Sequence, residues 1–180
     1  MINLLLATML ALQPNTSPPM LALRTNIPAW GATVMNVEPE LYFNDKFSFA
    51  LPLYWCPWFI TESKALRVFA SQPELRFRLS PSPFGHHFGL HGSLAWYNLK
   101  FGHYRYQDVK RPLLGGGISY GYSLSIAPNW SLDFSLGVGC ASLCYERFYN
   151  TPNGAKADTR KTFYWGIDQI SISIGYILDI

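Results

Sequence analysis

His91 and Ser93 are the two residues of this sequence whose types and spacing best fit nucleophilic catalysis. On a β-strand, residues two positions apart project from the same face, so the imidazole could act as a base on the neighbouring hydroxyl. Such a pair also needs a third group that orients the imidazole, and no residue can be assigned to that role from the sequence. We therefore predict no catalytic residue and expect that the protein is not an enzyme.

The remaining histidines and the cysteines do not form a metal-binding pattern. His86 and His87 are adjacent, so on a strand their rings point to opposite faces. The three cysteines, Cys56, Cys140 and Cys144, are an odd number without CxxC spacing, which provides neither a zinc site nor a closed set of disulfides. We expect no metal ion and no cofactor.

Eight polar residues, most of them charged, share the polar phase of segments that alternate like strands. If these strands surround a common interior, the side chains meet there, with both signs of charge present. Buried charges must be paired and hydrogen-bonded, because each unpaired one costs on the order of several kcal/mol. We predict a structural network of ion pairs in the lumen; the alternative, a relay of protons or ions, needs an open path. The predicted lumen residues are Arg24, Asn26, Glu38, Glu40, Glu74, Arg76, Arg78 and Asp133.

The segment 100–111 is the best candidate for binding at the surface. It carries four basic residues and one acidic residue among aromatic side chains. Lys and Arg attract phosphate, so a loop of this kind beside an anionic lipopolysaccharide leaflet would contact lipid or a specific partner. The predicted binding residues are Lys100, Tyr104, Arg105, Tyr106, Lys110 and Arg111.

Composition limits the elements that can position these residues. The chain has 180 residues, of which 49% are hydrophobic and only 14% charged, whereas soluble domains carry about a quarter of charged residues. No segment after the N-terminus approaches the roughly 18 to 20 unbroken apolar residues of a membrane helix. The net charge of +3 is too small to indicate nucleic acid as a partner.

The N-terminus has the pattern of an export leader. Residues 4–12 form an apolar segment of signal-peptide length, and polar, proline-rich residues follow at 13–19. We predict a leader over 1–19 and a single domain over 20–180. No Lys or Arg precedes the apolar segment and no clear A-x-A site is present, so the cleavage point stays open. A short buried helix is the alternative.

Alternation of apolar and polar residues with period two predicts β-strands over most of the chain. In the clearest case, Ile170, Ile172 and Ile174 alternate with Ser171 and Ser173. The same period predicts eight strands, with a change of phase near 70–73. Their approximate ranges are 20–30, 34–43, 47–57, 65–79, 86–98, 113–126, 130–145 and 163–179.

One face of these strands is aliphatic and aromatic, while the other carries glycine, serine and charge. A soluble sandwich packs its apolar face against a second sheet, whereas an outer-membrane barrel turns that face to lipid. Eight strands make the smallest common barrel of this kind, with a lumen filled by side chains. We therefore predict an all-β fold, an eight-stranded antiparallel transmembrane β-barrel.

Connection lengths and tryptophans agree with this interpretation. Short turns at 44–46, 80–83 and 127–129 alternate with longer connections at 57–64, 99–112 and 148–162. Because the short turns of such barrels face the periplasm, both termini are expected there. The six tryptophans lie near predicted strand ends, as in an aromatic girdle. The alternative is that they are core residues of a soluble lipocalin-like barrel.

Four strings, QPELRF at 72–77, FGLHG at 88–92, GGISYGY at 116–122 and LGVG at 136–139, resemble the bacterial domain of unknown function 3575. The resemblance covers roughly residues 22 to 180 and includes LRTN at 23–26. It implies a small outer-membrane barrel of the kind found mainly in Bacteroidetes, whose members are often associated with surface-fibre (fimbrial) loci. It implies no catalytic residues.

These patterns predict a non-enzymatic integral outer-membrane barrel that acts as a membrane anchor or interaction partner. Its expected partners are outer-membrane lipid, including lipopolysaccharide, and envelope proteins such as components of surface fibres. The alternative function is a lipid-modifying enzyme of the lipid A deacylase kind that uses His91. A soluble ligand-binding barrel is a third interpretation.

Overall fold

The computed structural model describes residues 20–61, 64–80, 83–108, 111–151 and 153–179. The predicted leader over 1–19 and Lys110 of the predicted binding segment lie outside these residues.

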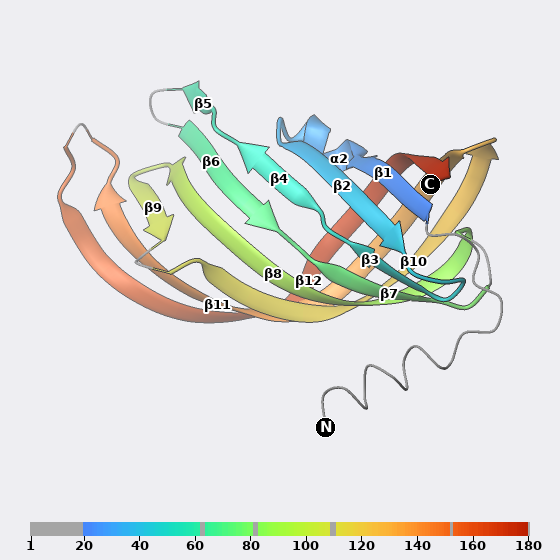
Figure 1. The fold of residues 1–180 in the computed structure, drawn as a ribbon. Helices are drawn as coiled ribbons and strands as arrows, with labels where there is room; N and C mark the ends of the chain where they lie inside the picture. The colour runs from blue at the N-terminus through green and yellow to red at the C-terminus, as the bar shows by residue number, and fades with distance from the viewer. Residues whose placement is uncertain (1–19, 62–63, 81–82, 109–110, 152, 180) are drawn as a thin grey trace.

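The described chain is almost entirely β-strand (Figure 1). Twelve strands belong to one sheet, in which the recorded pairs are antiparallel, and a helix of five residues is inserted after the first strand. The elements are β1 (Met20–Asn26), α2 (Ile27–Gly31), β2 (Met35–Tyr42), β3 (Phe47–Ala50), β4 (Leu53–Cys56), β5 (Phe59–Thr61), β6 (Lys64–Ser71), β7 (Glu74–Arg78), β8 (Gly85–Phe101), β9 (Tyr104–Asp108), β10 (Leu113–Ala127), β11 (Trp130–Tyr149) and β12 (Lys156–Asp179). The prediction of an all-β antiparallel fold is confirmed.

Two of the predicted strands are each divided in the structure. The segment 47–57 forms β3 and β4 with Pro52 between them, and the segment 65–79 forms β6 and β7 on either side of Gln72 and Pro73. Proline has no N–H for the ladder, so regular pairing stops at these positions. The predicted change of phase near 70–73 coincides with the second break.

Other boundaries differ from the predictions. The first strand ends at Asn26, and α2 follows with a proline in its first turn. The predicted loops at 99–112 and 148–162 are wrong over much of their length, because β8 continues to Phe101, β9 spans Tyr104–Asp108 and β12 begins at Lys156. Pairing of β9 with β8 and β11 explains the first difference, since cross-strand hydrogen bonds order residues that carry no clear strand period of their own.

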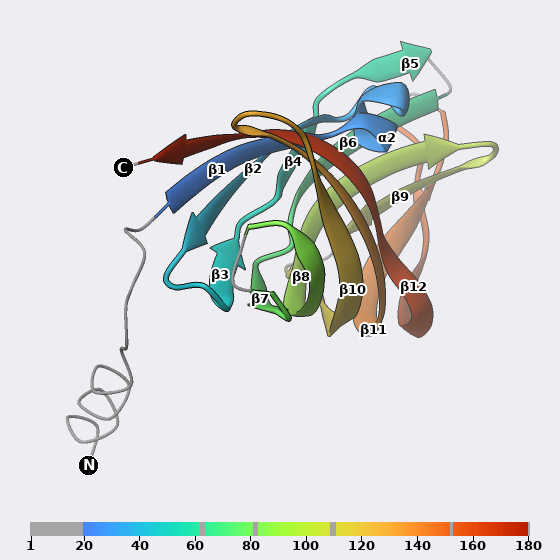
Figure 2. The ribbon, with the colours of Figure 1, turned by 90° about the vertical axis from the view of Figure 1, so that its right-hand side faces the viewer.

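The strand pairs return to their starting point. β1 pairs with β12 on one side and with β2 on the other. From β12 the pairs run through β11 and β10 to β8, which pairs with both β7 and β6. These two pair with β3 and β4, and both β3 and β4 pair with β2. Each divided strand therefore occupies one position in a closed ring of pairs, which Figure 2 shows from the side of the chain ends.

The ring is closed at one end only. β1 pairs with β12 from Asn26 opposite Ser173 to Met20 opposite Asp179. Within the described residues, the part of β12 at 156–172 has β11 as its only strand neighbour. In Figure 1, β11 and β12 extend well beyond the end of β1 and, with β6, β8 and β9, form a curved open sheet.

Burial is reversed relative to a soluble protein. The largest fully buried side chains are those of three arginines, two glutamates, an aspartate and a histidine. On the other face, Leu90 and Ile170 are 64% and 63% exposed. The buried apolar cluster is small, with Ala22, Tyr42 and Ile177 at its centre. No helix among the described residues is long and apolar enough to cross a membrane.

Candidate functional site

Glu40 of β2 is the centre of a buried polar network. Its carboxylate accepts hydrogen bonds from Arg24 Nη1, from Arg76 Nη1 at 3.0 Å and from Arg78 Nη2 at 2.7 Å. Ser48 Oγ donates a fourth at 2.5 Å. Three guanidinium groups around one carboxylate carry excess positive charge, so further acids are needed nearby to balance them.

Three more carboxylates supply that balance. Glu38 lies 2.8 Å from Arg76 Nη2 and 3.6 Å from Arg24 Nη1. Glu74 accepts from Arg76 Nε at 2.8 Å and from the Ser119 hydroxyl. Asp133 accepts from Ser123 Oγ at 2.5 Å. Three arginines therefore share the interior with four acids, of which the three glutamates pair with them directly. Charge-assisted hydrogen bonds of this kind are the stronger class of contact in a dry interior.

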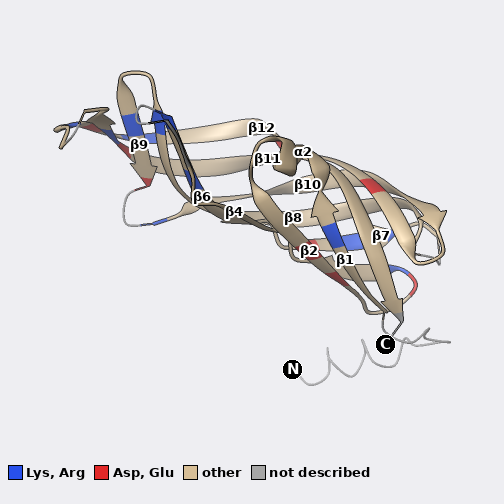
Figure 3. Cartoon of the chain, turned by 90° about the horizontal axis from the view of Figure 1, so that it is seen from above, with Lys and Arg blue, Asp and Glu red and all other residues tan. Residues whose placement is uncertain are grey.

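Strand register explains why these residues meet. β1, β2, β3 and β7 are neighbours in the ring, and directly opposite residues share a face. Arg24 is opposite Glu38, and Ser48 is opposite Arg76. Figure 3 shows charged residues on both the β7 side and the β2 side of the closed end. The period of the sequence placed them on one face, and the pairing of distant strands brings them together.

Inward-facing glycines provide the room for these long side chains. A Cβ atom at Gly89 would lie 2.0 Å from Glu74 Oε1, and one at Gly121 would lie 2.4 Å from His87 Nε2. Both glycines follow the polar phase of their strands. The charged side chains of other strands thus occupy the space that the small residues of the inward face leave open.

The structure places seven of the eight predicted lumen residues in this network and locates the eighth elsewhere. Asn26 is buried at the end of β1, where its Nδ2 donates to the Ile170 carbonyl at 3.5 Å and its backbone N–H donates to Asn36 Oδ1 at 2.6 Å. It joins β1 to β2 and β12 and contacts none of the arginines in the recorded hydrogen bonds.

Sequence reasoning missed the serine donors described above and also Tyr42 and His87. Tyr42 accepts from Arg24 Nη2 at 2.7 Å and lies under the Arg78 guanidinium, which is 4.8 Å from the ring centroid. His87 is fully buried, 3.8 Å from Asp133. Its position two residues before Gly89 on the inward phase was the available signal, although we considered this residue only as a metal ligand.

His91 has an orienting partner that the sequence did not reveal. Its Nε2 lies 2.9 Å from Asp168 Oδ2, 77 residues away in the chain. Asp168 is the extra residue of a β-bulge, because Gly137 is opposite Gln169 and Val138 is opposite Ile167. The bulge turns this carboxylate toward the inner face, a local geometry that period-two reasoning cannot predict.

The His91 and Asp168 pair does not complete a nucleophilic site. Ser93 Oγ accepts from Gln72 Nε2 at 3.2 Å, and no hydrogen bond between His91 and Ser93 is recorded among the described residues. His91 is buried inside the ring, whereas an enzyme acting on membrane lipid needs its base where lipid can reach it. No group of three or more His, Cys, Asp or Glu in the described ranges could hold a metal ion.

The predicted surface segment is divided between two faces of a strand pair. Lys100 is opposite Arg105 on the outer face, and the Arg105 guanidinium lies 4.7 Å from the Phe148 ring centroid. Tyr104 and Tyr106 take the inner face. Arg111 is exposed just before β10. The five predicted residues that the structure describes thus do not form one surface.

Tyr104 and Tyr106 belong to an aromatic cluster on the inner face of the open sheet. Tyr104 lies 5.8 Å from Tyr149, and Tyr106 lies 5.9 Å from Tyr145. The Arg147 guanidinium is 4.9 Å from the Tyr104 ring centroid. These contacts join β9 to β11 beyond the closed end.

Arg147 also binds Asp158 across the β11 and β12 hairpin. Its Nε and Nη2 donate to the two carboxylate oxygens at 2.6 and 2.5 Å. The hydrogen bonds from Arg147, together with a further one from Arg160, lower the pKa of the Asp158 carboxyl to about 2. This bidentate pair ties the two longest strands together outside the ring.

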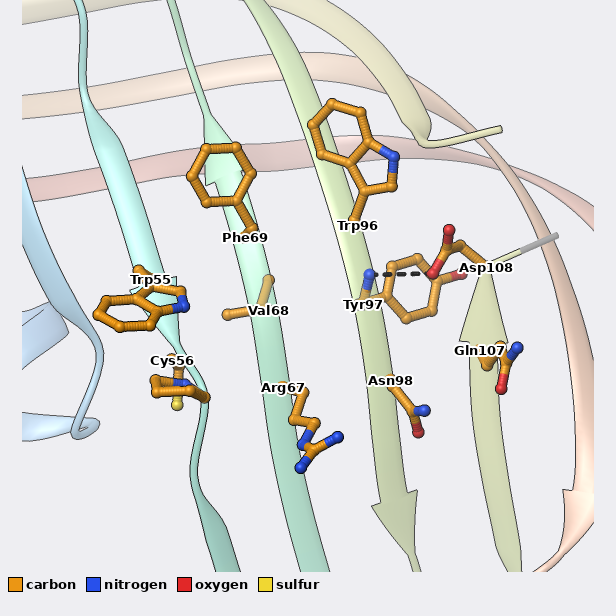
Figure 4. A pocket seen from close by; sticks show the side chains of 11 residues that line it. Trp55, Cys56, Arg67, Val68, Phe69, Trp96, Tyr97, Asn98, Gln107 and Asp108 are labelled. Carbon is orange, nitrogen blue, oxygen red and sulfur yellow. Dashed lines mark hydrogen bonds between the residues drawn. The ribbon is translucent and has the colours of Figure 1, made fainter. Parts of the chain in front are cut away.

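A groove of about 440 Å³ lies beside the outer face of β4, β6, β8 and β9 (Figure 4). Trp55, Phe69 and Trp96 are opposite one another and form a row of aromatic rings across three strands. The next row contains Arg67 opposite Asn98. The groove therefore combines an apolar floor with polar groups at one side.

Comparison with known proteins identifies the family. A family model described as a protein of unknown function, DUF3575, matches residues 1–178. The chain belongs to this family. The match confirms the DUF3575 resemblance drawn from four short strings. No curated protein and no solved structure matches the chain.

Proposed function

We propose that this DUF3575 protein is an integral β-barrel of a bacterial outer membrane that acts as an anchor or interaction partner and carries no catalytic activity. The observation that carries the proposal is a closed ring of strands with ion pairs inside and apolar side chains outside. Burying charge while exposing aliphatic residues is costly in water. In a bilayer the same arrangement is favourable, because lipid covers the outer face and no sheet edge remains in the closed part.

The spacing of outward aromatic residues along β11 fits a bilayer. Trp130 packs on Tyr176 at 5.3 Å near one end of β11, and Cys140, ten residues along the strand, is opposite Trp165. Ten residues span about 33 to 34 Å of strand. A tilt of 35–45° reduces this to about 25 Å, the height of the apolar band in such barrels. The residues between, such as Phe134, Leu136 and Val138, are exposed and apolar. On β12 the same span includes residues 165–172, where, within the described chain, α2 rather than a second strand lies beside β12.

The interior argues against a soluble ligand-binding barrel. Lipocalin-like barrels of eight strands hold one small ligand inside. Here the ring interior is occupied by Arg24, Arg76, Arg78 and their carboxylate partners, all nearly inaccessible. Such an interior leaves an apolar ligand no comparable place to bind.

Retention by membranes tests the proposal. Cells that express the full chain are lysed, and their outer membranes are washed with alkaline carbonate. We expect the protein to stay with the membranes while a soluble periplasmic protein is released. Recovery of this protein in the soluble fraction would refute the barrel proposal.

A lipid-modifying enzyme is the competing function, because His91 has a carboxylate partner in Asp168. We expect the lipid A of cells with and without the protein to have the same mass. A change of one acyl chain that disappears in His91→Ala would establish the enzyme instead.

We propose that the partner bound by this anchor is a surface-fibre component, because of the family resemblance. We also propose that both ends of the chain lie in the periplasm. Deletion of the gene should then remove assembled fibres from the cell surface, and His91→Ala should restore them. Normal fibres in the deletion strain would exclude this partner.

A further inference from the structure

The groove beside β4, β6, β8 and β9 is a feature that an anchor does not need. It has a volume of about 440 Å³, within the range of sites that bind small molecules or cofactors. The side chains that Figure 4 labels belong to β4, β6, β8 and β9. Its residues also change in character from one row to the next.

Three successive rows of outward residues define that change. The first is Trp55, Phe69 and Trp96, with the Phe69 and Trp96 rings 5.9 Å apart. The second is Arg67, Asn98 and Gln107, each opposite the next across β6, β8 and β9. The third contains Lys100 opposite Arg105. Aromatic groups are thus followed by a row of hydrogen-bond donors that includes the cation Arg67, and then by two further cations.

This order matches the chemistry at the edge of a lipid leaflet. Aromatic residues favour the interface, whereas the headgroup region beyond it is anionic where it carries phosphate. On β8, Leu94 lies two residues before Trp96 and is opposite the exposed Leu114 of β10. The aromatic row therefore borders the apolar surface. Figure 3 shows further Lys and Arg residues at the β9 end of the molecule.

We propose that this groove binds the phosphorylated headgroup of a lipid A molecule in the outer leaflet. Arg67 donates to the phosphate, since a guanidinium can give two parallel hydrogen bonds to one phosphate group. The amides of Asn98 and Gln107 donate beside it, and an acyl chain lies along Trp55, Phe69 and Trp96. This inference rests on the proposed position in the outer membrane.

Asp108 also lines the groove, and a carboxylate would repel phosphate. Its Oδ1 accepts the backbone N–H of Tyr97 at 3.3 Å, as Figure 4 shows. Tyr97 lies between the outward residues Trp96 and Asn98, and Asp108 follows the outward Gln107. Both therefore belong to the opposite phase of their strands. The carboxylate is therefore held on the backbone and away from the row of donors.

Binding of defined lipids to the purified full chain in detergent micelles tests the proposal. The probes are bisphosphorylated lipid A, the same lipid with its phosphates removed, and inorganic phosphate, with retained lipid measured by native mass spectrometry. We expect a preference of about tenfold or more for the phosphorylated lipid and a decrease of that preference as salt is raised. Inorganic phosphate at millimolar concentration should not compete; if it did, the site would be a phosphate site only.

Arg67→Gln should remove most of the preference, while the matched control Lys161→Gln should keep it. Lys161 is exposed and opposite Cys144 on β11 and β12, away from the groove. If Arg67→Gln fails to fold, the double variant Asn98→Leu and Gln107→Leu tests the same row without removing charge and should weaken the preference.

The proposal would be overturned if Arg67→Gln and Lys161→Gln lost the preference for phosphorylated lipid A equally, or if the wild type showed no such preference. The carbonate wash separates this failure from failure of the barrel. A protein that remains in membranes but does not distinguish the lipids refutes the groove alone, whereas a protein released by carbonate refutes both.

Discussion

At the scale of single residues, the buried network makes Glu40 the most consequential position. Its carboxylate accepts hydrogen bonds from three arginines in an interior that excludes solvent. Removing one partner of a buried ion pair leaves the other charges uncompensated, which costs about 3 to 5 kcal/mol. The network is therefore expected to hold the strands in register rather than to conduct ions.

Glu40→Gln should lower the free energy of unfolding by about 3 to 5 kcal/mol, because the amide cannot balance three guanidinium groups. Urea unfolding in lipid vesicles measures the change. The control is Glu146→Gln, whose partly exposed carboxylate pairs with Lys156 outside the ring; it should cost less than about 1 kcal/mol. Equal effects of the two substitutions would indicate a hydrated interior.

Gly89 tests whether the inward glycines make room for charge. A Cβ there would lie 2.0 Å from Glu74 Oε1 and 2.2 Å from Ser119 Oγ. Gly89→Ala should thus destabilise the protein by about 1 to 3 kcal/mol through overpacking. Gly31→Ala is the control, since a Cβ at that position meets no atom within 4 Å. Unchanged unfolding of Gly89→Ala would show that Glu74 can move aside.

At the scale of elements, the sequence predicted the strands with strong alternation and failed where pairing alone orders the chain. β10, β11 and the end of β12 repeat small inward and large outward residues, so their period is readable. β9 and the start of β12 mix Lys, Arg, Thr and Tyr, and only their neighbours fix them as strands. The bulge at Asp168 was equally hidden, because one inserted residue leaves no mark in composition.

The stability of the hairpin of β11 and β12 is predicted to depend on pH. Because the folded pKa of Asp158 is about 2 and the unfolded value is about 3.9, its ion pair stabilises the hairpin above about pH 4. That contribution is lost as pH falls toward 2. NMR titration of the Asp158 carboxyl in micelles should give the low midpoint, and Arg147→Gln should raise it toward the ordinary value. The same midpoint in wild type and variant would contradict this contact.

At the scale of the whole molecule, the alternation of faces was predictable but the partial opening of the ring was not. Period-two patterns assign each residue to a face of its strand. The closed end follows from eight strand positions that occur one after another along the chain. The opening arises because β1 ends at Asn26 and pairs only from Ser173 onward in β12. β1 stops where α2 begins, and the strand period at 20–30 did not reveal this helix.

The position of the whole molecule in a bilayer can be tested with two charged substitutions at different depths. Phe134 faces outward on β11, four residues beyond Trp130 and six before Cys140, which is opposite Trp165. This places it near the middle of the proposed apolar band. Phe163 faces outward two residues before Trp165, at the edge of the band. Both are exposed aromatic residues on paired strands, so they differ mainly in depth.

Phe134→Arg should cost about 2 to 4 kcal/mol of unfolding free energy in vesicles, because a cation near the bilayer midplane loses its hydration. Phe163→Arg should cost about 0 to 1 kcal/mol, because near the interface the side chain reaches water and phosphate. Urea titration of both variants in vesicles measures the difference. In a soluble protein neither exposed site would lose solvation on substitution, so equal and small costs at the two positions would contradict the membrane-spanning arrangement.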